Sequence, residues 1–202
     1  MWALIEDGSI TKLINNPRGM IIDDIQYSRN IFSFRWSNEE REAIGLYEVI
    51  QNNAKKKDEE YYTNTDQTFT YDADAGTVTA TYGDATAKAH ADANATDEDG
   101  AELDPVVVIE GLKTRKIRTI KKQAASELAR TDWYIVRKAD ADTAIPSAIT
   151  NHRAAVRTKC AQMETAVTNA SNTAAIETLY TYTKQEDGSV TRPLGNLPTL
   201  EV

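Results

Sequence analysis

The chain has 202 residues, a mass of 22.4 kDa and a formal net charge of −8, from 31 acidic and 23 basic residues. Proteins that wrap nucleic acid gain affinity by neutralising phosphates, so this acidic balance argues against nucleic acid as a partner. One cysteine excludes an intrachain disulfide and a thiolate zinc cluster, and two histidines leave little for a metal site or a catalytic triad. The length suits one long domain or two small lobes.

Membrane insertion is not expected from the hydropathy pattern. The longest aliphatic run covers only residues 106–109, whereas a membrane helix needs roughly 20 apolar residues. The first residues carry no basic stretch and reach Glu6 and Asp7 at once, so we expect no signal peptide.

Residues 1–84 predict a β-rich N-terminal lobe, which begins with a hairpin. Apolar runs at 2–6 and 10–14 flank Asp7-Gly8, and Asp-Gly between two such runs is the usual signal of a tight hairpin turn. The sequence therefore predicts an antiparallel strand pair at the start of the chain.

A second hairpin is predicted later in the same lobe. Residues 67–71 and 77–82 are rich in Thr, Val and aromatic residues, which suit a half-buried pleated surface, and residues 72–76 supply turn chemistry. Alternation along the strands places Phe69 and Tyr71 on the same face of the hairpin. Val78 and Ala80 are expected opposite them on the second strand.

One helix is expected between the two hairpins. Ser37 is followed three residues later by Glu40, which is the spacing of a capping box. Apolar residues then recur at three- and four-residue steps, at Ala43, Ile44, Tyr47 and Ile50. This spacing predicts a helix over residues 38–52.

Residues 85–112 are rich in Ala, Asp and Asn and have no apolar periodicity, which is typical of an acidic linker. The next ten residues, 113–122, hold six bases. No aromatic residues are interleaved with them to stack on bases, so a solvated helix face or an acidic partner is favoured over nucleic acid. The reversal of charge marks the expected lobe boundary.

Residues 113–202 predict a helical hairpin followed by an extended tail. Helical spacing covers 114–130, and Pro146 can begin a second helix that carries Ile149, Val156 and Met163. A short third helix is expected over 173–180. The fold class is therefore α+β: short antiparallel β-hairpins with one helix, an acidic linker and a C-terminal helical hairpin.

No motif in the chain assembles a catalytic or metal site. Asp72, Asp74 and Gly76 begin like a calcium loop, but Thr77 and Gly83 stand where that loop needs Gly and Glu. Cys160 and His152 are two helical turns apart, too far for a thiolate and its base. An enzyme would need convergent polar groups, and the strongest set is better interpreted as ion pairs closing the hairpin: Asp132, Arg137, Arg153 and Arg157. We expect no enzyme activity, cofactor or metal.

The C-terminal segment resembles a known family. Thr131-Asp132-Trp133-Tyr134, Ile145-Pro146, His152-Arg153 and Val156-Arg157 resemble the C-terminal helical hairpin of bacteriophage tail assembly chaperone-like proteins, and the ends of small tail or fibre-associated proteins of marine tailed phages. The stretch from Trp36-Ser37 through Glu40 to Ile44-Gly45 is similar to their N-terminal segment. The likeness covers about half the chain, and His152 stands where the family usually has Tyr.

This resemblance implies a non-enzymatic phage protein that acts by protein–protein contacts. The first expectation is a structural component of the virion, in the tail, baseplate or fibre attachment, made in the bacterial host cytoplasm and forming a symmetric homo-oligomer. The alternative is a tail or tail-fibre assembly chaperone that is absent from the mature virion. Other tail proteins are the expected partners. The candidate interface residues are the aromatics Trp2, Trp36, Trp133 and Tyr134.

Overall fold

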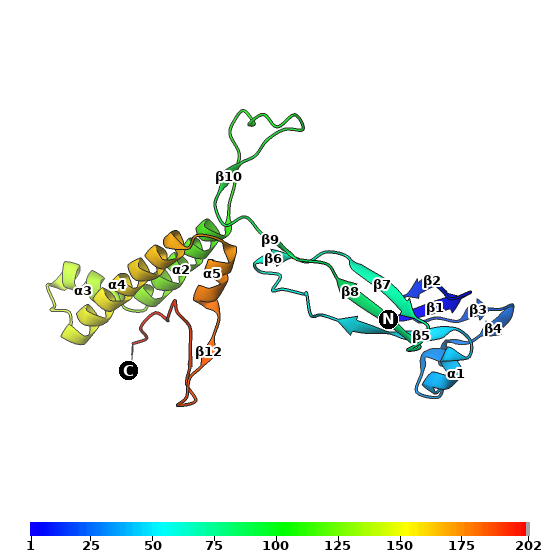
Figure 1. The fold of residues 1–202 in the computed structure, drawn as a ribbon. Coiled ribbons are helices and arrows are strands. Elements are labelled where there is room, and N and C mark those ends of the chain that lie inside the picture. Colours follow the sequence, from blue (N-terminus) through cyan, green and yellow to red (C-terminus); the bar gives the residue numbers. More distant parts are fainter. Residues whose placement is uncertain (201–202) are drawn as a thin grey trace. The chain divides into compact units, whose positions relative to one another are not determined.

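The computed structural model describes residues 1–200 and has a mixed α+β fold, as predicted. The chain divides into two compact units, Met1–Thr86 and the part that begins at Ala87 (Figure 1). The first unit holds the large sheet and the second holds the long helices. Each unit has its own hydrophobic core, and the two are described separately below.

A five-stranded sheet forms the centre of the first unit. Its strand order is β2 (Ser9–Ile14), β1 (Trp2–Glu6), β5 (Leu46–Asn52), β8 (Thr77–Tyr82) and β7 (Gln67–Asp72). The β1 and β2 strands pair antiparallel across Asp7 and Gly8, both of which have positive φ angles, of 50° and 73°. Consecutive positive φ angles belong to a type I′ turn, which explains why Asp-Gly was informative here.

The β7–β8 pair has the register that alternation predicted. Phe69 lies opposite Ala80, and Tyr71 lies opposite Val78. The other edge of β8 pairs with β5 in parallel, with Val49 opposite Val78. This parallel pairing joins the two hairpins into one sheet and was not anticipated from the sequence.

The predicted helix over residues 38–52 is wrong beyond its first turns. The capping box of Ser37 and Glu40 is present, but α1 covers only Asn38–Glu42, and the chain then continues as β5. Gly45 has a φ of 74°, and the Gly45 carbonyl accepts a hydrogen bond from the Ile5 amide at 2.8 Å. The pairing of β5 with β1 and β8 outweighs the helical spacing of the apolar residues, because each strand residue gains cross-strand partners.

Shorter elements complete the first unit. They are β3 (Met20–Ile22), β4 (Ile25–Tyr27), a 3₁₀ turn at Arg29–Phe32 and β6 (Tyr62–Thr63), which pairs with β9 (Thr86–Ala87). The main core cluster contains Leu4, Ile14, Ile22, Ile31 and Leu46. A second cluster on the sheet contains Ala3, Val49, Val78 and Ala80.

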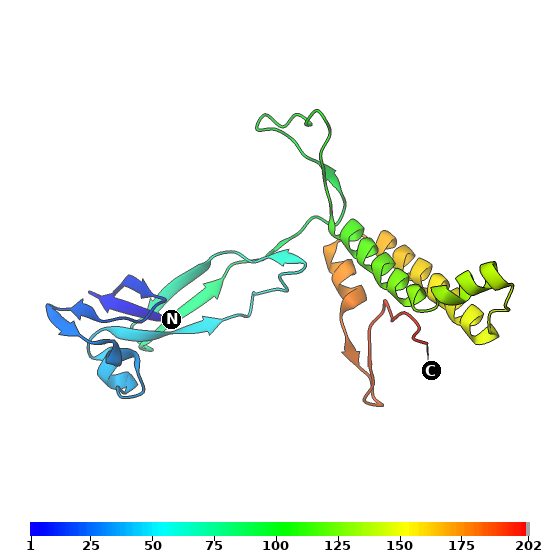
Figure 2. The ribbon, with the colours of Figure 1, turned by 180° about the vertical axis from the view of Figure 1, so that it is seen from behind.

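The second unit is built around two long helices, α2 (Leu112–Ala129) and α4 (Ser147–Asn169), which lie side by side in both views (Figures 1 and 2). The predicted seven-residue stripe of α4 is buried, at Ile149, Val156 and Met163. The short helix α5 has the predicted bounds, Thr173–Tyr180. The tail contains the strand pair β12 (Thr183–Lys184) and β13 (Val190–Thr191), and it returns to bury Leu194 against Ile120 and Val167.

Two elements of this unit were not anticipated. Helix α3 (Asp132–Ala141) occupies most of the expected loop between the long helices. Within the acidic segment, β10 (Ala93–Asn94) pairs antiparallel with β11 (Val108–Ile109), so that this part of the chain forms a projecting arm (Figures 1 and 2).

Candidate protein interface at helix α3

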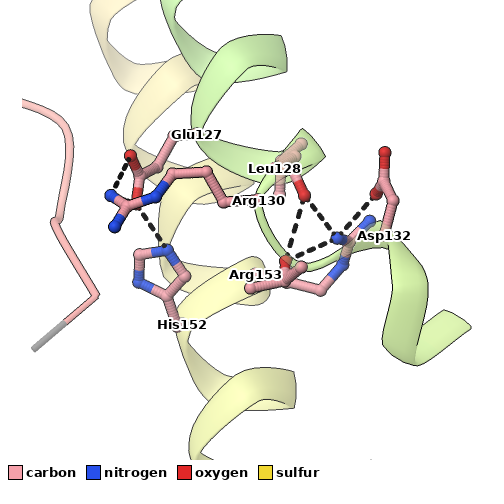
Figure 3. Close-up of polar contacts among 7 residues, drawn as sticks. Glu127, Leu128, Arg130, Asp132, His152 and Arg153 are labelled. Atoms are coloured by element: carbon pink, nitrogen blue, oxygen red, sulfur yellow. Dashed lines mark hydrogen bonds and ion pairs between the residues drawn. The ribbon is translucent and has the colours of Figure 1, made fainter. Parts of the chain in front are cut away.

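The start of α3 is fixed by one buried arginine. Arg153 of α4 is 7% exposed, and its Nη1 atom donates to the Leu128 carbonyl at 2.8 Å and to the Thr131 hydroxyl at 2.7 Å. The same atom lies 2.8 Å from Asp132 Oδ1 (Figure 3). Asp132 stands in the first turn of α3, where a carboxylate is favoured by the helix dipole. Arg153 therefore ties the end of α2 and the beginning of α3 to α4.

A second polar contact lies beside this one. Glu127 accepts from Arg130 at 3.2 Å, and its other oxygen lies 3.2 Å from His152 Nε2 (Figure 3). Burial alone would raise the pKa of Glu127, but the hydrogen bond and charge of Arg130, a hydrogen bond from the Leu200 backbone and the charge of His152 outweigh it and lower the pKa. Glu127 is therefore ionised and holds both neighbours at the junction of α2 and α4.

Helix α3 exposes apolar side chains instead of burying them. None of its ten residues is buried. Trp133 is 52% exposed and Val136 is 65% exposed, and Ile135 is exposed as well. We call the run Trp133, Tyr134, Ile135, Val136 and Arg137 the α3 patch; five consecutive residues span the circumference of a helix, so the patch surrounds α3 and does not lie on one face. Large apolar side chains exposed together in this way often mark a protein–protein contact.

The aromatic part of the α3 patch is ordered by its own contacts. The rings of Trp133 and Tyr134 have centroids 3.8 Å apart, and the Arg137 guanidinium lies 4.8 Å from the Trp133 ring centroid. Trp, Tyr and Arg are the residues most enriched at binding hot spots, because they combine large apolar area with directed polar groups. The α3 patch can therefore bind an apolar protein surface and place one cation beside it.

The four aromatics expected at an interface lie in two different places. Trp133 and Tyr134 come together on α3. Trp2 and Trp36 instead pack, partly buried, against the main core of the first unit. The Arg41 guanidinium covers the Trp2 ring at 4.9 Å, and Trp36 meets Tyr27 edge to face with centroids 5.9 Å apart. These two side chains contribute to the packing of the sheet.

Of the polar residues expected to close the helical hairpin, Asp132 and Arg153 do form an ion pair. Arg137 instead contacts the rings of Trp133 and Tyr134. Sequence reasoning missed Ile135 and Val136 as surface residues because the segment was expected to be a loop. The signal that could have revealed α3 was Asp132 directly after Thr131, a helix-start pattern.

Residues 1–200 contain no group of three or more His, Cys, Asp or Glu side chains placed to hold a metal ion. No helix in the same range is both long enough and apolar enough to cross a membrane.

Comparison with known proteins gives no relative. No protein-family model, curated protein or solved structure matches the chain.

Proposed function

We propose that this chain is a structural component of a tailed-bacteriophage virion, in the tail, baseplate or fibre attachment, and that it acts by protein–protein contacts through the α3 patch. The observation that carries the proposal is the α3 patch itself, a helix with no buried residue and an exposed Trp, Ile and Val. The residues that resemble phage tail proteins, from Thr131 to Arg157, include this helix and the arginine that holds it.

The division of the chain supports an adaptor role. The proposed architecture has a β-rich lobe at 1–84, an acidic linker at 85–112 and a helical hairpin with its tail at 113–202. Two units with separate cores can each hold a different neighbour, which suits a protein that bridges tail components. Symmetric homo-oligomers are common in such assemblies, and we expect this chain to form one.

The second candidate is a tail or tail-fibre assembly chaperone that leaves before the virion matures. The feature that favours it is the same segment, because the motif around Asp132, Trp133 and Arg153 resembles the hairpin of chaperone-like proteins. Both roles use the α3 patch, and they differ only in whether the chain stays bound to its partner in the mature virion.

Mass spectrometry of purified mature virions separates the two roles. A virion component is expected at a fixed copy number that is a multiple of three or six, because tail symmetry is cyclic. Absence from virions, together with co-purification with a fibre or tape-measure protein from infected lysate, would instead assign the chaperone role.

A matched pair of variants tests the contact surface. Val136→Asp places a charge in the α3 patch, whereas Val190→Asp places the same charge on β13, where the valine is similarly exposed (65% and 58%). We expect Val136→Asp to lose incorporation into virions and Val190→Asp to keep it. Equal incorporation of the two variants, with unchanged circular dichroism, would show that α3 is not the contact surface.

A further inference from the structure

The arm at residues 92–110 is held at its base and projects from the helices (Figures 1 and 2). Asp92 accepts from the Gly111 amide at 2.7 Å and from the Thr114 hydroxyl at 2.8 Å, which ties it to the first turn of α2. Further out, the Ala95 amide donates to the Val107 carbonyl at 2.7 Å, and the Leu103 amide donates to the Ala95 carbonyl. The arm is thus a paired structure with a defined direction.

The arm combines exposed aliphatic side chains with a strong negative charge. Val106, Val107, Val108 and Ile109 are 49% to 58% exposed. The arm contains no Lys or Arg, and its seven carboxylates are Asp92, Asp97, Glu98, Asp99, Glu102, Asp104 and Glu110. A partner for this surface needs an apolar groove with basic residues along its rim.

The second unit itself contains such a groove. It lies between α2 and α4, has a volume of about 270 Å³, and its floor is formed by small and apolar side chains: Ala124, Ala125, Leu128, Cys160 and Ala161. Lys121 and Arg157 stand at its rim, and Glu164 beside Lys121 pairs with it at 3.3 Å. The groove is therefore lined by two bases, Lys121 of α2 and Arg157 of α4, and by one acid, Glu164.

We propose that the arm of one copy of this chain occupies the α2–α4 groove of a second copy, in a reciprocal exchange. Alternate side chains of the aliphatic run 106–109 lie on the alanine floor, and the flanking carboxylates, Asp104 among them, face Lys121 and Arg157. Each copy gives one arm and receives one, so the exchange closes as a two-fold dimer.

Charge distinguishes this arrangement from direct pairing of two arms. Two β11 edges could add to one another as strands, but that would bring the carboxylates of both arms together without a single base. Docking on α2 and α4 replaces this repulsion with attraction. The hydrogen bonds from Gly111 and Thr114 to Asp92 hold the base of the arm at the first turn of α2, and no arm residue lines the groove of its own chain.

A disulfide cross-link tests the contact directly. Cys160, in the floor of the groove, is the chain's only cysteine. Burial and a hydrogen bond to Glu164 raise the pKa of its thiol, so oxidation should be done at alkaline pH. We expect full-length Val107→Cys to give a covalent dimer on mild oxidation, with peptide mapping joining residues 107 and 160. The control Val190→Cys, on a valine that is slightly more exposed (58% against 49% for Val107), should give far less of that dimer.

Other cross-linking results would overturn the proposal. A link between residues 107 of two chains would show arm-to-arm pairing, and a 107–160 link within one chain would show that the arm folds onto its own groove. A protein that remains an uncross-linked monomer in sedimentation velocity at high micromolar concentration would assign the arm to a different partner.

A second pair of variants tests the contribution of the groove to dimerisation without introducing a cysteine. Ala161→Glu puts a carboxylate in the groove, where the acidic arm would be repelled, and Ala155→Glu puts the same charge on the exposed surface of α4 outside it. We expect Ala161→Glu to weaken dimerisation by about tenfold or more and Ala155→Glu to leave it unchanged. Equal dissociation constants would overturn the proposal. This contact joins two copies and does not involve α3, so it can fail while the proposed virion role stands, and the reverse also holds.

Discussion

A buried arginine holds a chain reversal in each of the two units, and a tryptophan accompanies each of them. Arg41 donates to the carbonyls of Ile31 and Ser33 at 2.8 and 2.6 Å, much as Arg153 donates to Leu128 and Thr131. The tryptophans differ. Trp2 lies beneath Arg41 and packs against the core, whereas Trp133, next to the partner of Arg153, is 52% exposed.

The difference shows what a buried arginine can do for a neighbouring aromatic residue. In the first unit the guanidinium closes over the ring, so that the aromatic becomes part of the packing. In the second unit the Arg153 guanidinium donates to the end of α2 and to Asp132. It therefore fixes the start of α3, a helix in which no residue is buried. The same residue type therefore stabilises a core in one unit and presents a surface in the other.

The largest effect is expected where the first unit depends on long-range strand pairing. A Cβ atom at Gly45 would lie 2.4 Å from the Ile5 carbonyl oxygen, and the φ there is positive. Gly45→Ala should therefore cost about 4 kcal/mol, from the backbone conformation and the shift of β1 together. Gly8→Ala has a similar φ but open space around it, so it should cost only about 1 kcal/mol. Urea unfolding measures the free energies of unfolding of the two variants. Equal losses would contradict the conclusion that close packing of Gly45 against β1 is needed for the β1–β5 pairing.

The next effect compares the two arginines. Arg41→Ala should lower the free energy of unfolding by about 3 kcal/mol, since it leaves buried carbonyls without donors. Arg153→Ala should cost about 2 kcal/mol, because its partner Asp132 is 57% exposed and regains water. Hydrogen exchange measured by mass spectrometry assigns each loss to its own unit. Faster exchange in the same unit for both variants would contradict the conclusion that each arginine stabilises its own unit.

The tryptophans give a smaller effect with a clear contrast. Trp2→Ala should cost about 2 kcal/mol, below the value for a fully buried ring, because the side chain is only partly buried. Trp133→Ala should change stability by less than about 0.5 kcal/mol, as is usual for exposed positions. Chemical denaturation of both variants checks this. A large loss for Trp133→Ala would mean that α3 supports the fold and is not simply presented by it.

The smallest expected effect is a dependence on pH in the second unit. The pKa of Glu127 is lowered in the folded chain from its ordinary value of 4.5, so its contribution to stability is full above that value and is lost as the pH falls through the folded pKa. Glu127→Gln should cost about 0.5 kcal/mol at neutral pH and should flatten the acid side of the stability profile. An unchanged profile from urea midpoints across the acid range would contradict the role of this carboxylate.

Local patterns in the sequence predicted several of the local elements. The helix expected over 114–130 is α2, Leu112–Ala129, and the one over 173–180 has the bounds of α5. The turn at Asp7-Gly8 and the capping box at Ser37 are also present, because each depends on residues within one turn of each other. Of the four candidate interface residues, Trp133 and Tyr134 lie in the α3 patch, whereas Trp2 and Trp36 pack against the core of the first unit.

The tertiary structure alone decided those features that depend on contacts between residues far apart in the sequence. Residues 46–52 have helical spacing, yet they form a strand because β1 and β8 supply backbone partners on both edges. Trp2 and Trp133 cannot be told apart in sequence, since burial depends on whether residues far along the chain pack against the ring, as the core cluster of the first unit does against Trp2. The arm is similar: its acidic composition was read from the sequence, but its attachment depends on hydrogen bonds from Gly111 and Thr114, at the start of α2, to the distant Asp92. Sequence determined the local elements and the overall charge, and the fold decided which apolar surfaces are covered, because burial is a property of contacts between residues far apart in the chain.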